Sequence, residues 1–152
     1  MILNNRLNLG ELHNHYCPSL TASDFATLKG CHKILAVNCS PRVRCWLRRM
    51  AAPHDMVVCV AGSLEEACGW LAVSLDYAAV VCDEDLPNAS GWDLLAWLRH
   101  DRESSLPFLL LCAAPPPFDP TPRLKLMAKP VDPVVLREAL HQLLVLHLRQ
   151  YA

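Results

Sequence analysis

The chain has 152 residues, which is enough for one domain with a substantial hydrophobic core. Hydrophobic residues make up 53% of it, but they come in short blocks, and none reaches the roughly 20 apolar residues of a membrane span. The formal net charge of -1 gives no reason to expect nucleic acid as a partner. The first residues lack the basic-then-apolar pattern of a signal peptide, so we expect a cytoplasmic location.

The chain has eight cysteines, which would suggest disulfides in a secreted protein. No C-x-x-C pair is present, so the sequence does not support a zinc or redox motif. Cys59, Cys82 and Cys112 lie inside apolar, strand-like runs and are expected to be small buried hydrophobic residues. Another group of possible ligands has a spacing that fits no zinc pattern. Its members are His13, His15, Cys17, Cys31 and His32.

Residues 1–31 show no sustained hydrophobic period, and we interpret them as an N-terminal arm or linker, with a short helix at 23–28. From residue 32 to residue 152 we expect one domain, because strand and helix patterns alternate there, as they do in parallel α/β sheets. The expected elements follow in chain order. They are a strand at 33–37, a helix opened by Ser40 and Pro41, a strand at 56–61, a helix opened by a capping box at 63–66, a strand at 78–82, a helix at 91–99, strands at 108–113 and 124–127, and a helix at 133–149.

One connection breaks this alternation. Residues 114–122 contain five prolines in nine positions. Proline lacks an amide donor and clashes with the preceding turn, so no ordinary helix can form there. The sequence therefore predicts a doubly wound parallel sheet of five βα units whose fourth helix is short or replaced by a proline-rich loop.

The most informative stretch follows the third expected strand. Asp83 ends an apolar run, and a Leu-Pro turn and Gly91 follow at fixed offsets. Open α/β sheets keep their chemistry at the carboxyl ends of such strands. The spacing D-x-x-L-P-x-x-x-G resembles the receiver domain of two-component response regulators, in which the phosphoacceptor aspartate takes the place of Asp83. Two further blocks match: the first strand with its proline-started helix, and Lys129-Pro130, a turn often cis at the proline.

The resemblance implies a flavodoxin-like (βα)5 fold and an apparatus for phosphoryl transfer. In such a domain Asp83 would accept the phosphoryl group, Lys129 would support it, and further carboxylates would hold Mg²⁺. A serine or threonine at the end of the fourth strand would couple the event to an aromatic residue on the fifth strand.

This sequence departs from that pattern at most of these places. Asn38 and Cys39 stand where the family has its acidic pair, and a thiol is a poor ligand for Mg²⁺. Cys112 stands at the hydroxyl position and Leu126 at the aromatic position. Asp83, Lys129 and Asp85 remain. In one interpretation Asp83, Asp85, Asn38 and Cys39 would form a degenerate metal site. In the other, Asp83 and Asp85 would be loop carboxylates, one of which pairs with Lys129.

The favoured interpretation is a degenerate receiver domain in phosphorelay signal transduction. It would act as a phosphorylation-independent protein–protein interaction or dimerisation module, would not be an enzyme, and would use no cofactor or only weakly bound Mg²⁺. One alternative is a functional Asp83 phosphoacceptor with a modified Mg²⁺ site. Another is a receiver-like domain that senses a small molecule in the emptied acidic pocket.

The expected partner is a signalling protein: a histidine kinase, a phosphotransfer protein or another part of a multidomain chain. In receivers the first helix belongs to the face that docks such partners, and here it is basic, although a solvated helix face is the commoner explanation of its arginines. Val135, Val145 and Leu148 lie off the main apolar face of the last helix, so a homodimer through that helix is a further hypothesis. Neither nucleic acid nor a membrane is expected as a partner.

Overall fold

A computed structural model of the chain describes residues 33–74, 76–117 and 121–151, the last four without their side chains. The expected N-terminal arm, its short helix and the group of histidines and cysteines beginning at His13 lie outside the described residues. No helix in the described residues has both the length and the hydropathy that crossing a bilayer requires.

The described elements match the expected alternation. They are β1 (Lys33–Val37), α3 (Pro41–Ala51), the 3-10 turn η2 (Ala52–His54), β2 (Val57–Ala61), α4 (Leu64–Val73), β3 (Tyr77–Asp83), β4 (Asp85–Leu86), β5 (Ala89–Ser90), α5 (Gly91–Ala96), the π-helical turn η3 (Trp97–Asp101), β6 (Phe108–Cys112), β7 (Leu124–Ala128) and α6 (Pro133–Tyr151). The expected strands are confirmed to within one residue at each end. The expected helix at 91–99 is confirmed as α5 with its continuation into η3, where the α-helical pattern gives way to a π turn.

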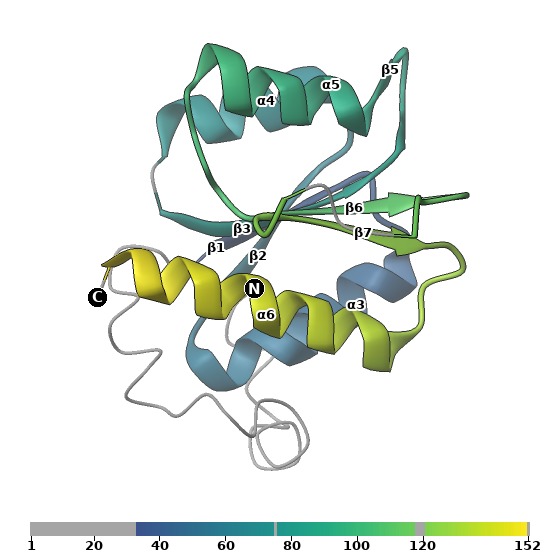
Figure 1. The fold of residues 1–152 in the computed structure, drawn as a ribbon, viewed down its shortest axis with the longest axis vertical. Coiled ribbons are helices and arrows are strands. Elements are labelled where there is room, and N and C mark those ends of the chain that lie inside the picture. Colours follow the sequence, from purple (N-terminus) through teal and green to yellow (C-terminus); the bar gives the residue numbers. More distant parts are fainter. Residues whose placement is uncertain (1–32, 75, 118–120, 152) are drawn as a thin grey trace.

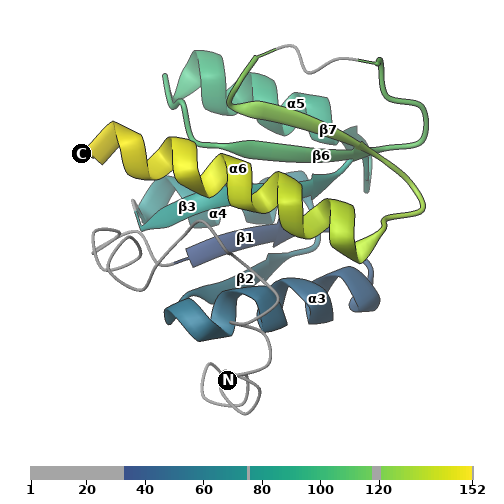
Figure 2. The same cartoon turned by 60° about the horizontal axis from the view of Figure 1, so that its bottom comes forward.

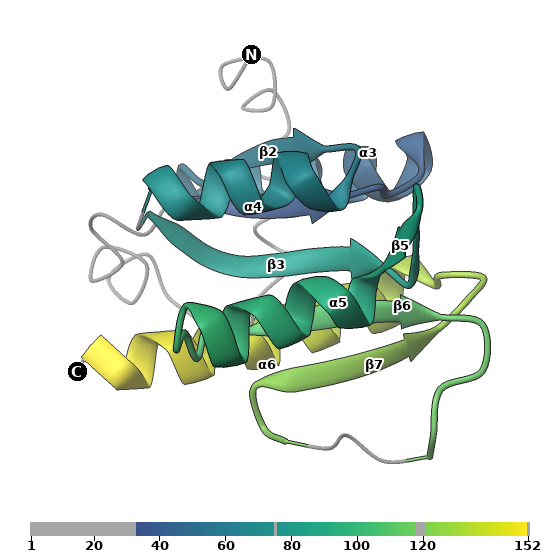
Figure 3. The same ribbon diagram turned by 90° about the horizontal axis from the view of Figure 1, so that it is seen from above.

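Five of the strands form one sheet in the order β2-β1-β3-β6-β7, and every neighbouring pair is parallel (Figure 3). This confirms the flavodoxin-like α/β fold. The carboxyl ends of parallel strands share one edge of the sheet, so Asp83, at the end of the central strand β3, lies in the middle of that edge.

Helices cover both faces of the sheet. α3 and α6 lie on one face, and α4 and α5 lie on the other (Figures 1 and 2). β3 sits at the centre of the sheet, and its residues from Tyr77 to Cys82 are all buried, as the continuous apolar run predicts. The largest fully buried side chains include Phe108 on β6, Leu47 on α3 and Leu140 on α6.

Serine side chains start three helices. Ser40 caps α3, and its Oγ accepts a hydrogen bond from the Val43 amide. Ser63 caps α4 as expected, but Glu66 accepts from the Gly62 amide rather than from the Ser63 amide. The expected capping box at 63–66 is therefore only half formed. A complete one occurs at the start of α5, where Asp93 accepts from the Ser90 amide.

The connection from β6 to β7 has no helix in its described residues, 113–117 and 121–123. It leads to β7, the edge strand of the sheet (Figure 3). The expected replacement of the fourth helix by a proline-rich loop is thus confirmed for the described part of this segment.

Candidate functional site

The candidate site lies at the edge of the sheet where β1, β3, β6 and β7 end. Asp83, the last residue of β3, pairs in register with Leu111 of β6. Lys129 follows β7 directly, and its amide donates to the Cys112 carbonyl, which fixes the start of the β7–α6 loop. The Lys129-Pro130 peptide bond is cis.

An ion-pair network occupies the centre of this edge. The Lys129 ammonium donates to Asp83 Oδ1 at 3.1 Å and Oδ2 at 3.4 Å, and it lies 3.5 Å from Asp85 Oδ2. The Asp85 amide also donates to Asp83 Oδ1, at 2.8 Å. The Asp83 side chain is 17% exposed and that of Lys129 is 30% exposed, so solvent screens the pair only in part. Burial acts to lower the pKa of Lys129, but hydrogen bonding and the charges of Asp83 and Asp85 outweigh it, and the pKa is raised.

Asn38 closes the network from β1. Its backbone has a φ of 50°, a left-handed conformation that asparagine tolerates better than most residues. Its side-chain amide donates to the Asp85 carbonyl oxygen at 2.7 Å. In receivers the carbonyl oxygen at this position is a metal ligand, whereas here the oxygen accepts a hydrogen bond from the neutral Asn38 amide.

Cys39 does not join the site. It is 3% exposed and packs in the core cluster under α3 and α6, and its thiol lies against the carbonyls of Val37 and Val81. Burial, and secondly the charge of Asp83, raise the pKa of this thiol to about 12. A thiol held in this position, beneath α3 and α6, is a poor partner for Mg²⁺.

Cys112 makes no side-chain hydrogen bond to the carboxylates of Asp83 and Asp85. It is 1% exposed, lies in the core cluster on the α4 and α5 face, and its thiol is directed to the Leu110 carbonyl. Burial is the main cause that raises its pKa. Leu126, at the position of the receiver aromatic, is partly buried against the same cluster.

These placements determine how well the site fits Mg²⁺. Of the four expected ligands, the structure brings Asp83, Asp85 and Asn38 together and leaves Cys39 in the core. The Asp83 carboxylate is bound by Lys129, and the Asp85 carbonyl by an amide donor. Among the described residues, no three His, Cys, Asp or Glu side chains form a metal-binding group. The donors of this arrangement do not fit a Mg²⁺ site.

A cleft of about 520 Å³ adjoins the network. It lies between the first turns of α3 and the loop after Lys129, and its walls combine apolar, aromatic and basic side chains. The lining residues are Ser40, Pro41, Arg42, Val43, Trp46, Asp83, Leu111, Lys129, Pro130 and Val131. Sequence reasoning did not find this cleft, because its two walls are some ninety positions apart in the chain and neither carries a ligand-binding motif.

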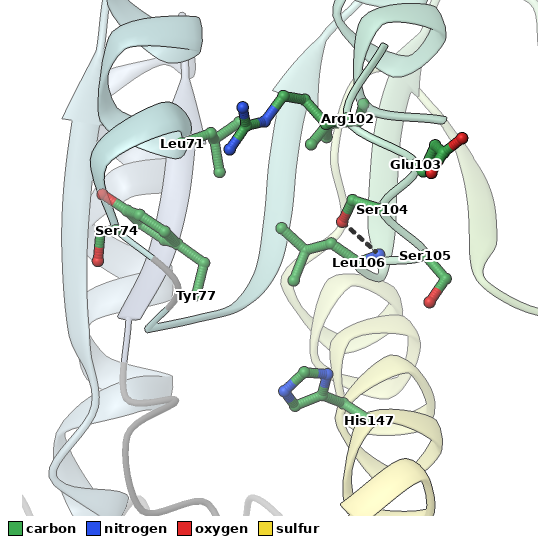
Figure 4. Close-up of a pocket in the computed structure, with 10 residues that line it drawn as sticks. Leu71, Ser74, Tyr77, Arg102, Glu103, Ser104, Ser105, Leu106 and His147 are labelled. Atoms are coloured by element: carbon green, nitrogen blue, oxygen red, sulfur yellow. Dashed lines mark hydrogen bonds between the residues drawn. The ribbon is translucent and has the colours of Figure 1, made fainter. Parts of the chain in front are cut away.

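A second cavity, of about 340 Å³, lies at the opposite end of the sheet. Figure 4 shows Tyr77 and Ser74 on one side of it, Ser104 and Leu106 on the other, and His147 of α6 below. It contains none of the residues expected to act in phosphoryl transfer. Its position near the amino ends of the strands separates it from the chemistry of Asp83.

Comparisons with known proteins support the fold. No protein-family model and no curated protein matches the sequence. Among solved structures, the chain is similar to the signal receiver domain of an HD domain-containing protein from Pseudomonas fluorescens Pf-5, with 22% identity, 80% of this chain and 92% of that one covered, and a TM-score of 0.64. It is similar to the chemotaxis response regulator CheY4 of Vibrio cholerae, with 19% identity, coverage of 73% and 97%, and a TM-score of 0.59.

A third similar structure is the receiver domain of the hybrid histidine kinase CckA, with 22% identity, coverage of 74% and 98%, and a TM-score of 0.58. At such identities a likeness establishes the arrangement of the backbone and not the activity. The chain therefore has the fold of response-regulator receiver domains, with the ion-pair network of Lys129, Asp83 and Asp85 at the edge where that fold carries its phosphoacceptor.

Proposed function

We propose that the chain is a receiver-type domain of two-component signal transduction that acts through protein–protein contacts without an aspartyl phosphate. It would have no catalytic activity of its own and would need no metal or other cofactor. Its partner would be a signalling protein, such as a histidine kinase, a phosphotransfer protein or another part of a multidomain chain, in the cytoplasm.

The observation that supports this proposal most directly is the closed network around Asp83. An acceptor carboxylate must approach a phosphoryl group that is also anionic. Bound Mg²⁺ and a lysine normally neutralise the negative charge of the two groups. Here the lysine binds Asp83 and Asp85, and the Asn38 amide engages the Asp85 carbonyl. The cation and the donors that would serve phosphoryl transfer are instead engaged with Asp83 and Asp85.

Cys112 adds to this argument. A receiver responds to its phosphate through a hydroxyl at the end of the fourth strand, and Cys112 offers only a buried thiol there, a weak donor whose hydrogen bond goes to the Leu110 carbonyl. The proposed domain therefore keeps Lys129 but lacks the hydroxyl that would report a phosphoryl group.

The test is the intact mass of the protein after incubation with acetyl phosphate and Mg²⁺, beside an Asp83→Asn variant. We expect no phosphoryl adduct in either protein, under conditions that label an ordinary receiver domain in the same experiment. An adduct on the wild-type protein that the variant lacks would overturn the proposal. It would favour the alternative of a working Asp83 acceptor with a modified Mg²⁺ site, in which Asp85 would be the next residue to change.

A second candidate function is the sensing of a small molecule, which the cleft beside Asp83 favours. Its volume of about 520 Å³ falls in the range of ligand sites, roughly 300–1,000 Å³. Trp46 lines it, so a bound molecule would change the emission of that residue. Screening small organic acids by tryptophan fluorescence, with Trp46→Phe as the control, tests this candidate, and emission that no compound changes would count against it.

The homodimer through the last helix stays a prediction. Val134 and Val135, in the first turn of α6, are about half exposed, at 54% and 49%. Val145 packs against the core cluster on the α3 side, and the side chain of Leu148 lies outside the described residues. Sedimentation at increasing protein concentration tests this dimer, with Val135→Ser as the informative variant.

A further inference from the structure

Two helices on opposite faces of the sheet carry opposite charge. α3 contains Arg42, Arg44, Arg48 and Arg49 and no acidic residue. α4 contains Glu65 and Glu66 and no basic residue. α3 packs on the face shared with α6 and α4 on the face shared with α5, so these charges do not meet within one molecule (Figures 1 and 2).

The exposed part of α3 forms a stripe of helical spacing. Arg42, Cys45 and Arg49 are all exposed, at offsets of three and four residues, and we call them the arginine stripe. Arg44 donates to the Cys39 carbonyl. Among the described residues, Arg42 and Arg49 have no ion-pair partner.

The exposed part of α4 forms a matching stripe. Glu66, Trp70 and Val73 follow one another at offsets of four and three residues, and Gly69 lies next to Trp70 in the chain. All four are exposed, and we call them the glutamate stripe. Trp70 is 43% exposed and Val73 is 81% exposed, which leaves two large apolar side chains in solvent beside a carboxylate. Tryptophan and arginine are the residues most enriched where protein contacts are strongest.

We propose that copies of this chain associate head to tail, with the arginine stripe of one copy on the glutamate stripe of the next. The occupant we infer for each stripe is thus a second copy, because the two stripes are complementary in charge and α3 has no acidic residue of its own. The net charge of the whole chain is only -1, so copies do not repel one another strongly. This inference deepens the proposed function, since it rests on an interaction role and names the partner and the surface.

Such a contact uses two different surfaces, so it does not close on itself as a two-fold dimer does. A contact of this kind continues into longer chains unless its rotation closes a ring. Exposed ion pairs alone contribute little, and burial of Trp70 and Val73 would supply much of the binding, while the charges set orientation and salt dependence.

The test is sedimentation velocity over a range of protein concentrations, in buffers of about 0.05 M and about 0.5 M NaCl, where the screening length falls several-fold. We expect species larger than dimer at high concentration and low salt, and a loss of association by about tenfold or more in the high-salt buffer. Protein that stays monomeric at every concentration in low salt overturns the inference. So does a dimer that never extends and does not respond to salt.

Two variants sharpen the test. The first, Arg42→Gln with Arg49→Gln, changes only the arginine stripe. The second, Glu66→Gln with Trp70→Ser, changes only the glutamate stripe. We expect neither to associate alone, whereas their mixture forms a one-to-one dimer and nothing larger, because each retains the stripe that the other lacks. That mixed dimer also shows that both variants are folded.

If both variants associate like the wild type and Val135→Ser does not, the last helix is the interface and the head-to-tail contact is wrong. A phosphoryl adduct on Asp83 with unchanged head-to-tail association would overturn the phosphate-independent function and leave this inference standing.

Discussion

Gly91 stands where the start of α5 meets the end of β3, and a single added methyl group there tests the packing of the whole site. A Cβ at this position would lie 2.6 Å from the Asp83 carbonyl oxygen and 2.5 Å from Leu110 Cδ1. It would also lie 3.2 Å from the Cys82 sulfur. The Gly91 amide donates to the Glu84 carbonyl at 2.8 Å, which holds the backbone close to the strand.

Two effects of Gly91→Ala oppose each other. Alanine is favoured over glycine in helices by about 1 kcal/mol, less at a helix end. Overpacking costs about 1–3 kcal/mol, and here part of the clash is with a backbone oxygen, which cannot rotate away as a side chain can. The clash therefore wins, with a net loss of about 2 kcal/mol. For a protein of this size the loss corresponds to a fall of roughly 4–8 °C in Tm.

Gly69→Ala is the matched control, because a Cβ on Gly69 would meet no atom within 4 Å. Gly69 is exposed inside α4, so only the helix preference acts, and we expect a gain of about 0.5–1 kcal/mol. Urea denaturation of both variants, followed by circular dichroism, measures the two changes. If Gly91→Ala proves neutral or stabilising while Gly69→Ala behaves as expected, the close approach of α5 to β3 and the reasoning from it are refuted.

Three further predictions follow from the site and the core. Lys129→Met leaves the Asp83 carboxylate without its cation. Because solvent partly screens the pair, we expect the free energy of unfolding, measured by urea denaturation, to fall by about 1 kcal/mol. An unchanged midpoint would mean that the pair contributes nothing to stability. Burial, and secondly the charge of Arg123, lower the pKa of His147 to about 4, so the unfolded chain binds the proton more readily. Stability should therefore fall as the pH drops from about 6.5 towards 4, and His147→Gln should flatten that slope; an equally steep slope in the variant would contradict the assignment. Among the described cysteines only Cys45 is exposed, so iodoacetamide should label it in the native protein and spare the buried ones, which peptide mass mapping checks.

The fold could be predicted from the sequence because its signals are local. The run from Ala78 to Cys82 is continuously apolar, as a strand covered on both faces must be, and Ser40 with Pro41 starts a helix by capping and by a fixed φ. The proline cluster from Pro115 to Pro122 excluded a helix by simple chemistry, and the described part of that connection has none.

The site was less predictable, because a motif names residues and not the direction of their side chains. The sequence placed Asp83, Asp85 and Lys129 at one edge, and the structure has them in one ion-pair network. It did not indicate that Asn38 would act as a donor to a carbonyl, which depends on the left-handed backbone at that residue. Nor did it indicate that Cys39 would face the core. Asn38 and Cys39 are neighbours just past the end of β1, yet the first is exposed and the second is buried.

That inward direction of Cys39 limits which side chains the two positions after β1 can carry. An Asp introduced at position 39 would enter the core cluster beneath α3 and α6, where burial disfavours its charge and Arg44, which donates to the carbonyl of this residue, offsets only part of that cost. Position 38 is exposed, so an Asp there would be tolerated, but it would lose the amide that donates to the Asp85 carbonyl. A carboxylate at position 38 would thus cost the Asp85 loop one hydrogen bond, whereas a carboxylate at position 39 would require part of the core to repack. Packing, more than charge, therefore decides which acidic side chains this edge of the sheet accepts.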